Sequence, residues 1–307
     1  MHISPVIVHM KTKENPFQFN ETDELLDIRY DNNFKAVFTK DTPESKGALS
    51  GLISALIERK IVVETIKANE PAATSTFDRS IRFDIASKAI SGELINVEMT
   101  LFPEISEVVR LEYYSSRLFS GQDIKGILHG YSGLVETFQI AIIGKKIYQD
   151  KNLVHTFEYY DKYNNISFGG RSKIIIVELP KVMEKPTADM NTSERWSFFL
   201  QYLTNKGKRE KINEILKEEE GIAMAGKTLV NISQSEIDFA RETTELKRLV
   251  DYKSAMASYK LSGIAEGMKK GHIEEKFEIA RKMKNAGRPI SEIEEFTGLT
   301  SESIKGL

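Results

Sequence analysis

Asp84 and Glu98 are the two acidic residues of this chain whose surroundings best suit metal chemistry. They lie in two short apolar runs, Ile81–Ala86 and Leu94–Leu101, which flank a Ser91-Gly92 turn. This pattern predicts a β-hairpin with a longer loop. Carboxylate oxygens are preferred ligands of Mg²⁺, so two carboxylates brought together by paired strands would form a cradle for this ion.

The expected strand alternation places both acidic residues on the same face of the hairpin. In a strand, alternate side chains share a face. The face expected toward the core carries Phe83, Ile85, Ile95, Val97, Met99 and Leu101, and the opposite face carries Asp84, Asn96, Glu98 and Thr100. Antiparallel strands commonly expose one polar face. The alternative is therefore that Asp84 and Glu98 are ordinary solvent-facing residues.

Helical segments on either side of the hairpin carry further groups that could act at such a site. Phe34 and Phe38 are four residues apart, so a helix within 25–40 would place them on one face with Asp31 one turn earlier. Arg110 and Tyr114 have the same spacing in an expected helix over 104–122. Arg binds phosphate oxygens bidentately, but pairing of Arg110 with a carboxylate and packing of Tyr114 in a groove is the alternative.

Five stretches in order resemble the PD-(D/E)XK nuclease family transposases, also known as Rpn-like recombination-promoting nucleases. They are Asp31-Asn-Asn-Phe-Lys-Ala-Val-Phe38, Asp84 with Asn96-Val-Glu-Met-Thr100, Arg110-Leu-Glu-Tyr-Tyr114, Gln122–Tyr131 and Ile176-Val-Glu-Leu-Pro-Lys181. The resemblance covers roughly the first 180 residues. It implies an α/β fold with a restriction-endonuclease-like core, in which helices flank a mixed sheet, followed by an all-helical C-terminal region.

The expected organisation has four parts. They are an N-terminal arm at 1–24, a PD-(D/E)XK nuclease-like domain at 25–185, a helical extension at 186–262, and a connector with a small helix-turn-helix-like tail at 263–307. An amphipathic helix over 43–60 and strands at 61–66, 137–144, 154–161 and 173–179 would complete the core. Gly263, Gly267 and Gly271 indicate a flexible or weakly helical connector.

The resemblance implies a role for each residue of the hairpin site. Asp84, Glu98 and the backbone carbonyl of Met99 would hold Mg²⁺, with Mn²⁺ as a possible substitute. The third catalytic position, two residues after the glutamate, commonly carries Lys or Gln in the family and is Thr100 here. A threonine hydroxyl can hydrogen-bond a water but carries no charge, so either the metal binds and cleavage is slow, or another cation such as Lys35 substitutes.

Further residues are expected around this site by the same resemblance. Asp31 would be an auxiliary acidic residue, and Lys35, Arg110, Tyr114 and Gln122 would contact phosphate groups of DNA. The implied function is a Mg²⁺-dependent DNA endonuclease that hydrolyses phosphodiester bonds in recombination or transposition. The alternatives are a catalytically weakened or inactive nuclease fold that binds DNA or protein, and a helical scaffold in which the two carboxylates are incidental.

Composition and the lack of long apolar runs limit the kinds of metal site, the compartment and the partners that we expect. The 307 residues include no cysteine, which excludes disulfides and thiolate metal sites. No apolar run approaches the ~18 residues that span a bilayer, and the N-terminal segment lacks the pattern of a secretory signal. We therefore expect a cytoplasmic protein with DNA as partner and no membrane contact. The helical C-terminal region is a possible homodimer contact, since Lys305 is the only basic residue of the last expected helix.

Overall fold

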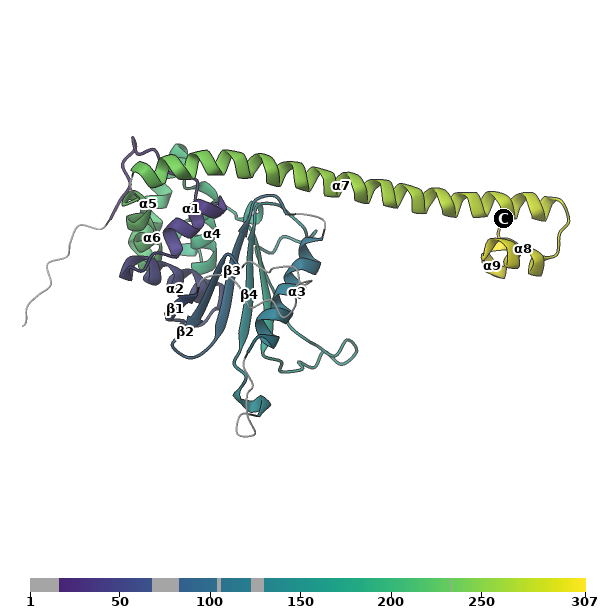
Figure 1. Ribbon diagram of the computed structural model, residues 1–307, viewed down its shortest axis with the longest axis horizontal. Helices are drawn as coiled ribbons and strands as arrows, with labels where there is room; N and C mark the ends of the chain where they lie inside the picture. The colour runs from purple at the N-terminus through teal and green to yellow at the C-terminus, as the bar shows by residue number, and fades with distance from the viewer. Residues whose placement is uncertain (1–16, 68–82, 104–105, 123–129, 233) are drawn as a thin grey trace, which may run out of the picture. The chain divides into compact units, whose positions relative to one another are not determined.

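The computed structural model describes residues 17–67, 83–103, 106–122, 130–232 and 234–307, so most of the expected N-terminal arm lies outside the described residues. Contacts divide the chain into two compact units, 1–249 and 250–307. The first is built on a six-stranded sheet with the order β1-β2-β3-β4-β6-β5 (Figure 1). The strands are β1 Val63–Lys67, β2 Ile85–Ala89, β3 Leu94–Thr100, β4 Thr137–Ile143, β5 Val154–Phe157 and β6 Ser172–Glu178.

The sheet is mixed, as the sequence predicts. Strands β3, β4 and β6 run parallel, whereas β1, β2 and β5 join their neighbours antiparallel. Every residue of β4 is buried, because parallel strands in the middle of a sheet are covered on both faces. The carboxyl ends of β3, β4 and β6 therefore meet along one edge, where polar side chains can gather.

Helices cover both faces of this sheet (Figure 1). One face carries α1 Asp31–Phe38, α2 Pro43–Ile57, α4 Thr192–Tyr202, α5 Arg209–Glu218 and α6 Glu220–Val230, and the other carries α3 Glu107–Ser120. Short 3-10 turns lie at Tyr131–Gly133, Leu179–Lys181, Thr187–Asp189 and Lys206–Lys208. The predicted α/β architecture, a mixed sheet flanked by helices, is confirmed.

Local sequence signals account for the helix that anchors the main core. The Thr42 side chain accepts a hydrogen bond from Ser45 N, and Pro43 occupies the first turn of α2, both favourable at a helix start. The apolar stripe predicted for this helix is buried, with Leu49, Leu52 and Ile53 fully inaccessible. The helix is therefore held by tertiary packing along one face.

One hydrophobic core joins residues on both sides of position 185. Phe38 of α1 packs against Trp196 of α4 with ring centroids 6.1 Å apart. Helices α2 and α6 cross so closely that a Cβ atom at Gly51 would lie 3.0 Å from the Cα atom of Gly221. The helical segment after residue 185 is therefore part of the same packed body as the sheet.

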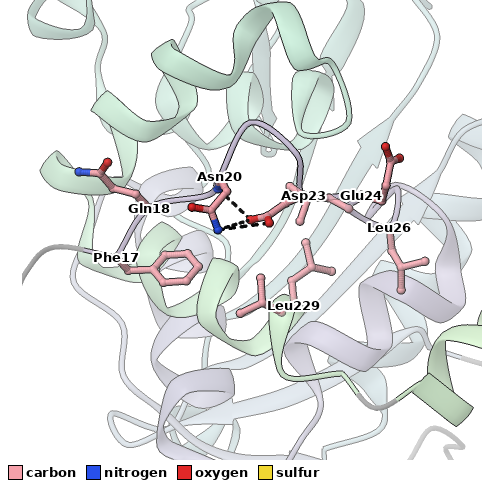
Figure 2. Close-up of a pocket in the computed structure, with 9 residues that line it drawn as sticks. Phe17, Gln18, Asn20, Asp23, Glu24, Leu26 and Leu229 are labelled. Atoms are coloured by element: carbon pink, nitrogen blue, oxygen red, sulfur yellow. Dashed lines mark hydrogen bonds between the residues drawn. The ribbon is translucent and has the colours of Figure 1, made fainter.

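The segment before α1 crosses this helical side of the sheet. The backbone N–H of Phe19 donates to Asn213 Oδ1, and Asn213 Nδ2 donates back to the Phe19 carbonyl, both at 2.9 Å. A pocket of about 350 Å³ lies beside this segment, between residues 17–26 and the end of α6 at Leu229 (Figure 2). Neither hairpin carboxylate lines it.

The second unit contains most of one long helix and a small helical tail. Helix α7 spans Gln234–Asn285, α8 spans Ile290–Thr297 and α9 spans Ser301–Lys305. Ala280, Ile293 and Ile304 form its core. Where the sequence predicts a flexible or weakly helical connector, α7 runs unbroken through all three glycines. Among the described residues, no helix combines the length and apolar character needed to cross a membrane.

Candidate active site

The hairpin forms, but its first strand is Ile85–Ala89 and so shares only Ile85 and Ala86 with the predicted run Ile81–Ala86. β2 pairs antiparallel with β3, with Ile85 opposite Val97. Asp84 itself lies outside the paired residues, directly before Ile85, and its charge acts on Glu98. The connecting turn requires a left-handed residue at Gly92, where φ is 106°, a conformation that glycine adopts without strain. Turn chemistry and alternation together set this register.

Glu98 is on the polar face of β3, and that face is buried. Ile95, Val97 and Met99 belong to the main core, whereas Asn96 and Glu98 are 0% and 2% exposed. The alternative of an ordinary solvent-facing residue is therefore wrong for Glu98. The physical reason is α3, which covers this face of the sheet (Figure 1).

Phe83 departs from the expected alternation. Its ring packs edge-on against Tyr114 of α3, with centroids 5.7 Å apart, and not in the main core beside Ile85. Regular strand geometry begins only at Ile85, so the period of two does not extend back to Phe83.

The two carboxylate oxygens of Glu98 have different surroundings. Oε1 accepts a hydrogen bond from Asn96 Nδ2 at 2.9 Å, and the same amide donates to Gln139 Oε1 of β4 at 3.0 Å. Oε2 lies 3.1 Å from Arg110 Nη2, yet accepts no hydrogen bond from any described residue. The buried amides thus orient the carboxylate through one oxygen and leave the other to charged groups.

Burial raises the pKa of Glu98 to about 7. The charge on Arg110 and the Asn96 hydrogen bond oppose this shift, while the charges on Asp84 and Glu107 add to it. Arg110 is shared, since its Nη2 is also 2.6 Å from Glu107 Oε1, and so it only partly compensates for the lost solvation. Burial lowers the Arg110 pKa, but the two glutamates outweigh it and raise that pKa further above its usual range.

Asp84 is held by side chains from α1. Lys35 Nζ is 3.1 Å from Asp84 Oδ1 and 2.8 Å from Asp31 Oδ1. Burial lowers the pKa of Lys35, but the charges of Asp84 and Asp31 and their hydrogen bonds raise it above its ordinary value. Helix α1 thus brings both predicted residues, Asp31 and Lys35, to the hairpin, because they lie one turn apart on one face.

Helix α3 brings Arg110 and Tyr114 to the same place. The Arg110 guanidinium lies over the Tyr114 ring, 5.2 Å from its centroid. Pairing of Arg110 with carboxylates and packing of Tyr114 against Phe83 are thus both observed. The Arg110 side chain is still 37% exposed, so part of its guanidinium faces solvent beside Glu98.

Gln122 is engaged with the backbone near the start of β4. Its Oε1 accepts from Val135 N at 2.8 Å, and its Nε2 donates to the Val135 carbonyl at 3.2 Å. The side chain therefore fixes the chain that enters β4. A contact between Gln122 and DNA stays a prediction.

The backbone at Thr100 is bonded to the chain beyond β4, which sets the direction of the neighbouring carbonyl groups. The Thr100 carbonyl accepts from Gly144 N, beyond the end of β4, at 2.9 Å. Successive strand carbonyls point to opposite edges, so the Met99 carbonyl points toward β2, which begins only at Ile85. Met99 O is thus directed to the side on which Asp84 lies.

These groups fit a divalent cation of the magnesium type. Among the residues that the structure describes, no three His, Cys, Asp or Glu side chains converge on a metal position, so a cation bound here would have at most two carboxylates as side-chain ligands. Mg²⁺ characteristically uses one or two carboxylates and retains several waters. Glu98 Oε2, buried and without a hydrogen bond, is the side-chain donor that fits best.

Sequence reasoning missed two buried partners of this site, Asn96 as a donor to Glu98 and Gln139 as the support of Asn96. The only signal for Gln139 is its polar side chain within the apolar run Thr137–Ile143. Buried amides of this kind are retained when they are hydrogen-bonded. Both residues act by holding Glu98 in place.

Comparison with known proteins gives one match. The family model described as PD-(D/E)XK nuclease family transposase matches residues 28–259, which is 232 of the 307 residues. The matched region begins before α1, contains the whole sheet and ends within α7. No curated protein and no solved structure matches the chain.

Proposed function

Because this chain belongs to the PD-(D/E)XK nuclease family transposases, we propose that it is a Mg²⁺-dependent DNA endonuclease that serves recombination or transposition. The observation that supports this proposal is the buried Glu98 carboxylate on β3, on which the charge of Asp84 acts from the start of the hairpin. A buried carboxylate on a polar cluster is costly for folding, which favours a functional reason for its presence.

Asp84, Glu98 and the Met99 carbonyl would hold the cation, with Mn²⁺ as an alternative ion. When bound, such an ion lowers the pKa of a water and stabilises charge on the phosphate. Asn96 keeps Glu98 oriented through its hydrogen bond. Asp31 acts as the auxiliary acid by holding Lys35 beside Asp84.

The remaining residues would bind the DNA phosphates. Lys35 pairs with Asp84 at 3.1 Å, and we assign it the role that the family's Lys or Gln has at the position of Thr100. The Thr100 hydroxyl can bind a water. Arg110, stacked on Tyr114 and partly exposed, contacts a phosphate from the α3 side, and we retain Gln122 as a more distant contact.

Nicking of supercoiled plasmid by the full chain tests this proposal. We expect cleavage with Mg²⁺, and with Mn²⁺ in parallel, that falls at least about 100-fold in Asp84→Ala and in Glu98→Ala because a metal ligand is lost. Glu112→Ala, which removes an exposed acidic residue of α3, is the control and should cut normally. Cleavage that survives both ligand substitutions would contradict the assignment.

Thr100 favours a second candidate function, a nuclease fold that binds DNA or protein without cutting. A missing transition-state donor costs on the order of 10²–10³ in rate. If the folded protein binds DNA but does not nick plasmid, Thr100→Lys and Thr100→Gln distinguish the two cases. Restored cleavage would mean an intact metal site without its third group.

We also propose that the protein acts in the cytoplasm as a homodimer through its helical C-terminal region. The absence of cysteine fits a reducing compartment. Leu261, Ile264 and Met268 are exposed on α7 at spacings of three and four residues, the pattern of a helix–helix seam.

A further inference from the structure

A lysine-bearing loop begins directly beside Thr100. Thr100 is in register with Ile143, the last residue of β4, and Gly144 N donates to the Thr100 carbonyl. A Cβ atom at Gly144 would lie 2.9 Å from the Leu101 carbonyl oxygen, so the two backbones approach closely there. The next residues are Lys145 and Lys146, at the edge of the candidate active site.

The loop from 144 to 153, which we call the basic loop, is rich in exposed cations. Lys145, Lys146 and Lys151 are exposed, and Asp150 is its only acidic residue. Asp150 is itself neutralised, since its carboxylate lies 3.0 Å from His155 Nε2 and 3.5 Å from Lys181 Nζ. The net charge that the loop presents is therefore positive.

A fully buried carboxylate that the hairpin site does not use fixes the backbone of this loop. Glu178 has no exposed surface and is in register with Ile143, two strands from Thr100. It accepts hydrogen bonds from the backbone N–H groups of Ile147 and Tyr148 and pairs with Lys181. A buried charge is tolerable when paired and hydrogen-bonded in this way.

The other end of the loop is tied to the same strand. Glu178 N donates to the Leu153 carbonyl at 2.9 Å, and the His155 ring packs against the Tyr148 ring at a tilt of 48°, with centroids 4.7 Å apart. The basic loop is thus held at residues 147, 148, 150 and 153. A loop fixed before binding loses less conformational entropy when a partner binds.

We propose that Lys145 and Lys146 bind the phosphate backbone of DNA beside the phosphate presented to Asp84 and Glu98. This inference rests on the proposed function, because it takes DNA as the partner. Lys binds phosphate as a point charge. Thr100, at the third catalytic position, carries no charge, and the two lysines on the loop beside it bring positive charge to this edge of the sheet. The buried Glu178 cluster is the support that holds them there.

Equilibrium binding without cleavage tests the proposal. The full chain is titrated against a fluorescent DNA duplex of about 30 bp in EDTA, at several KCl concentrations. In Lys145→Gln/Lys146→Gln, loss of two phosphate contacts should weaken binding about tenfold or more near 0.1 M salt and reduce the salt slope by about 2. Lys217→Gln/Lys227→Gln, which removes two exposed lysines from α5 and α6, should bind as the parent does.

Unchanged affinity and slope in the loop variant would overturn the inference, as would an equal loss in the control variant or no binding by the parent chain. All substituted side chains are exposed, so folding should be retained, which thermal unfolding checks. The plasmid assay separates this inference from the proposed activity. If the parent chain binds DNA but never cuts it, the proposed endonuclease activity is contradicted while the role of the basic loop can still hold. If the parent chain cuts DNA and the loop variant binds normally, the role of the basic loop is contradicted while the endonuclease activity stands.

Discussion

Glu98 is the residue at which function and stability oppose each other. Its carboxylate is almost fully buried, one oxygen lacks a hydrogen bond, and its nearest cation is shared with Glu107. A group in these surroundings is more stable protonated than ionised, which is why its pKa rises to about 7. The ionised form that binds a cation is therefore the one that destabilises the fold.

This gives a pH-dependent stability prediction for Glu98→Gln. Between pH 4.5, the ordinary value, and about 7 the folded state holds the Glu98 proton more tightly than the unfolded state, so its contribution to stability falls as pH rises. A glutamine side chain does not ionise, so its contribution to stability does not fall as pH rises. The free energy of unfolding of Glu98→Gln, relative to that of the parent, should therefore rise by on the order of 2–3 kcal/mol between pH 5 and pH 8.

Urea unfolding at both pH values measures this difference. Glu112→Gln, at an exposed glutamate of α3, is the control, and its free energy of unfolding should differ from that of the parent by the same amount at both pH values. A Glu98→Gln effect of equal size at pH 5 and pH 8 would show that the carboxylate does not change its ionisation in this range.

Alternation and turn chemistry made it predictable from the sequence that Glu98 lies on the polar face of a hairpin strand. The amide partners were not, because Asn96 meets Gln139 across a parallel pairing between strands 43 residues apart in sequence. No local pattern fixes the register of such a pairing. Glu107 was missed for a related reason. It matters to the site only because it shares Arg110 with Glu98 of β3, and this sharing depends on how α3 packs on the sheet.

At the scale of elements, the site depends on three segments meeting at one hairpin. α1 supplies Asp31 and Lys35, β3 supplies Glu98, and α3 supplies Arg110. A slip of one residue between β2 and β3 would move Glu98 to the other face. The sequence predicts each segment, because each carries a clear periodicity, but only the packed sheet explains why the polar face is covered by α3.

Helix α7 shows where local sequence signals mislead. Glycines at every fourth residue favour a weak connector by propensity alone, yet the helix continues through them and Glu266 pairs with Lys270 one turn later at 2.8 Å. Favourable pairs of this kind add only a few tenths of a kcal/mol each. The glycines should therefore remain the weakest part of the helix.

Replacing Gly263, Gly267 and Gly271 by Ala should strengthen α7. A Cβ atom at each position would meet no atom within 4 Å, so each substitution should gain about 0.5–1 kcal/mol of local helix stability. Slower amide hydrogen exchange over residues 260–275 is the expected result. Gly51→Ala is the opposite control, because its Cβ would press on the Gly221 backbone and should destabilise the protein. Unchanged exchange in the triple variant would contradict the prediction.

At the scale of the whole molecule, the candidate active site and the exposed apolar stripe Leu261, Ile264 and Met268 lie in different units. All residues assigned to the candidate active site lie in unit 1–249, together with the basic loop. The family match ends at residue 259, so the tail of α7 with α8 and α9 lies beyond it. The sequence predicts a helical C-terminal region but not its role, because amphipathic helices serve many kinds of contact.

The proposed homodimer gives the last prediction. Leu261, Ile264 and Met268 are 69%, 49% and 72% exposed, and a second copy of the same stripe would remove this apolar surface from water. Light scattering coupled to size exclusion should give a dimer mass that falls on dilution. Leu261→Lys/Met268→Lys should shift the protein to monomer, because like charges would meet across the seam.

Ile273→Lys is the matched control, since Ile273 is exposed on the same helix but off the three-four spacing, and it should leave the mass unchanged. A monomeric parent, or a dimer that both variants retain, would exclude this seam. A dimer held by α7 would carry two copies of the candidate active site, and cutting of both DNA strands in one binding event should then be lost in the monomeric variant while single-strand nicking remains.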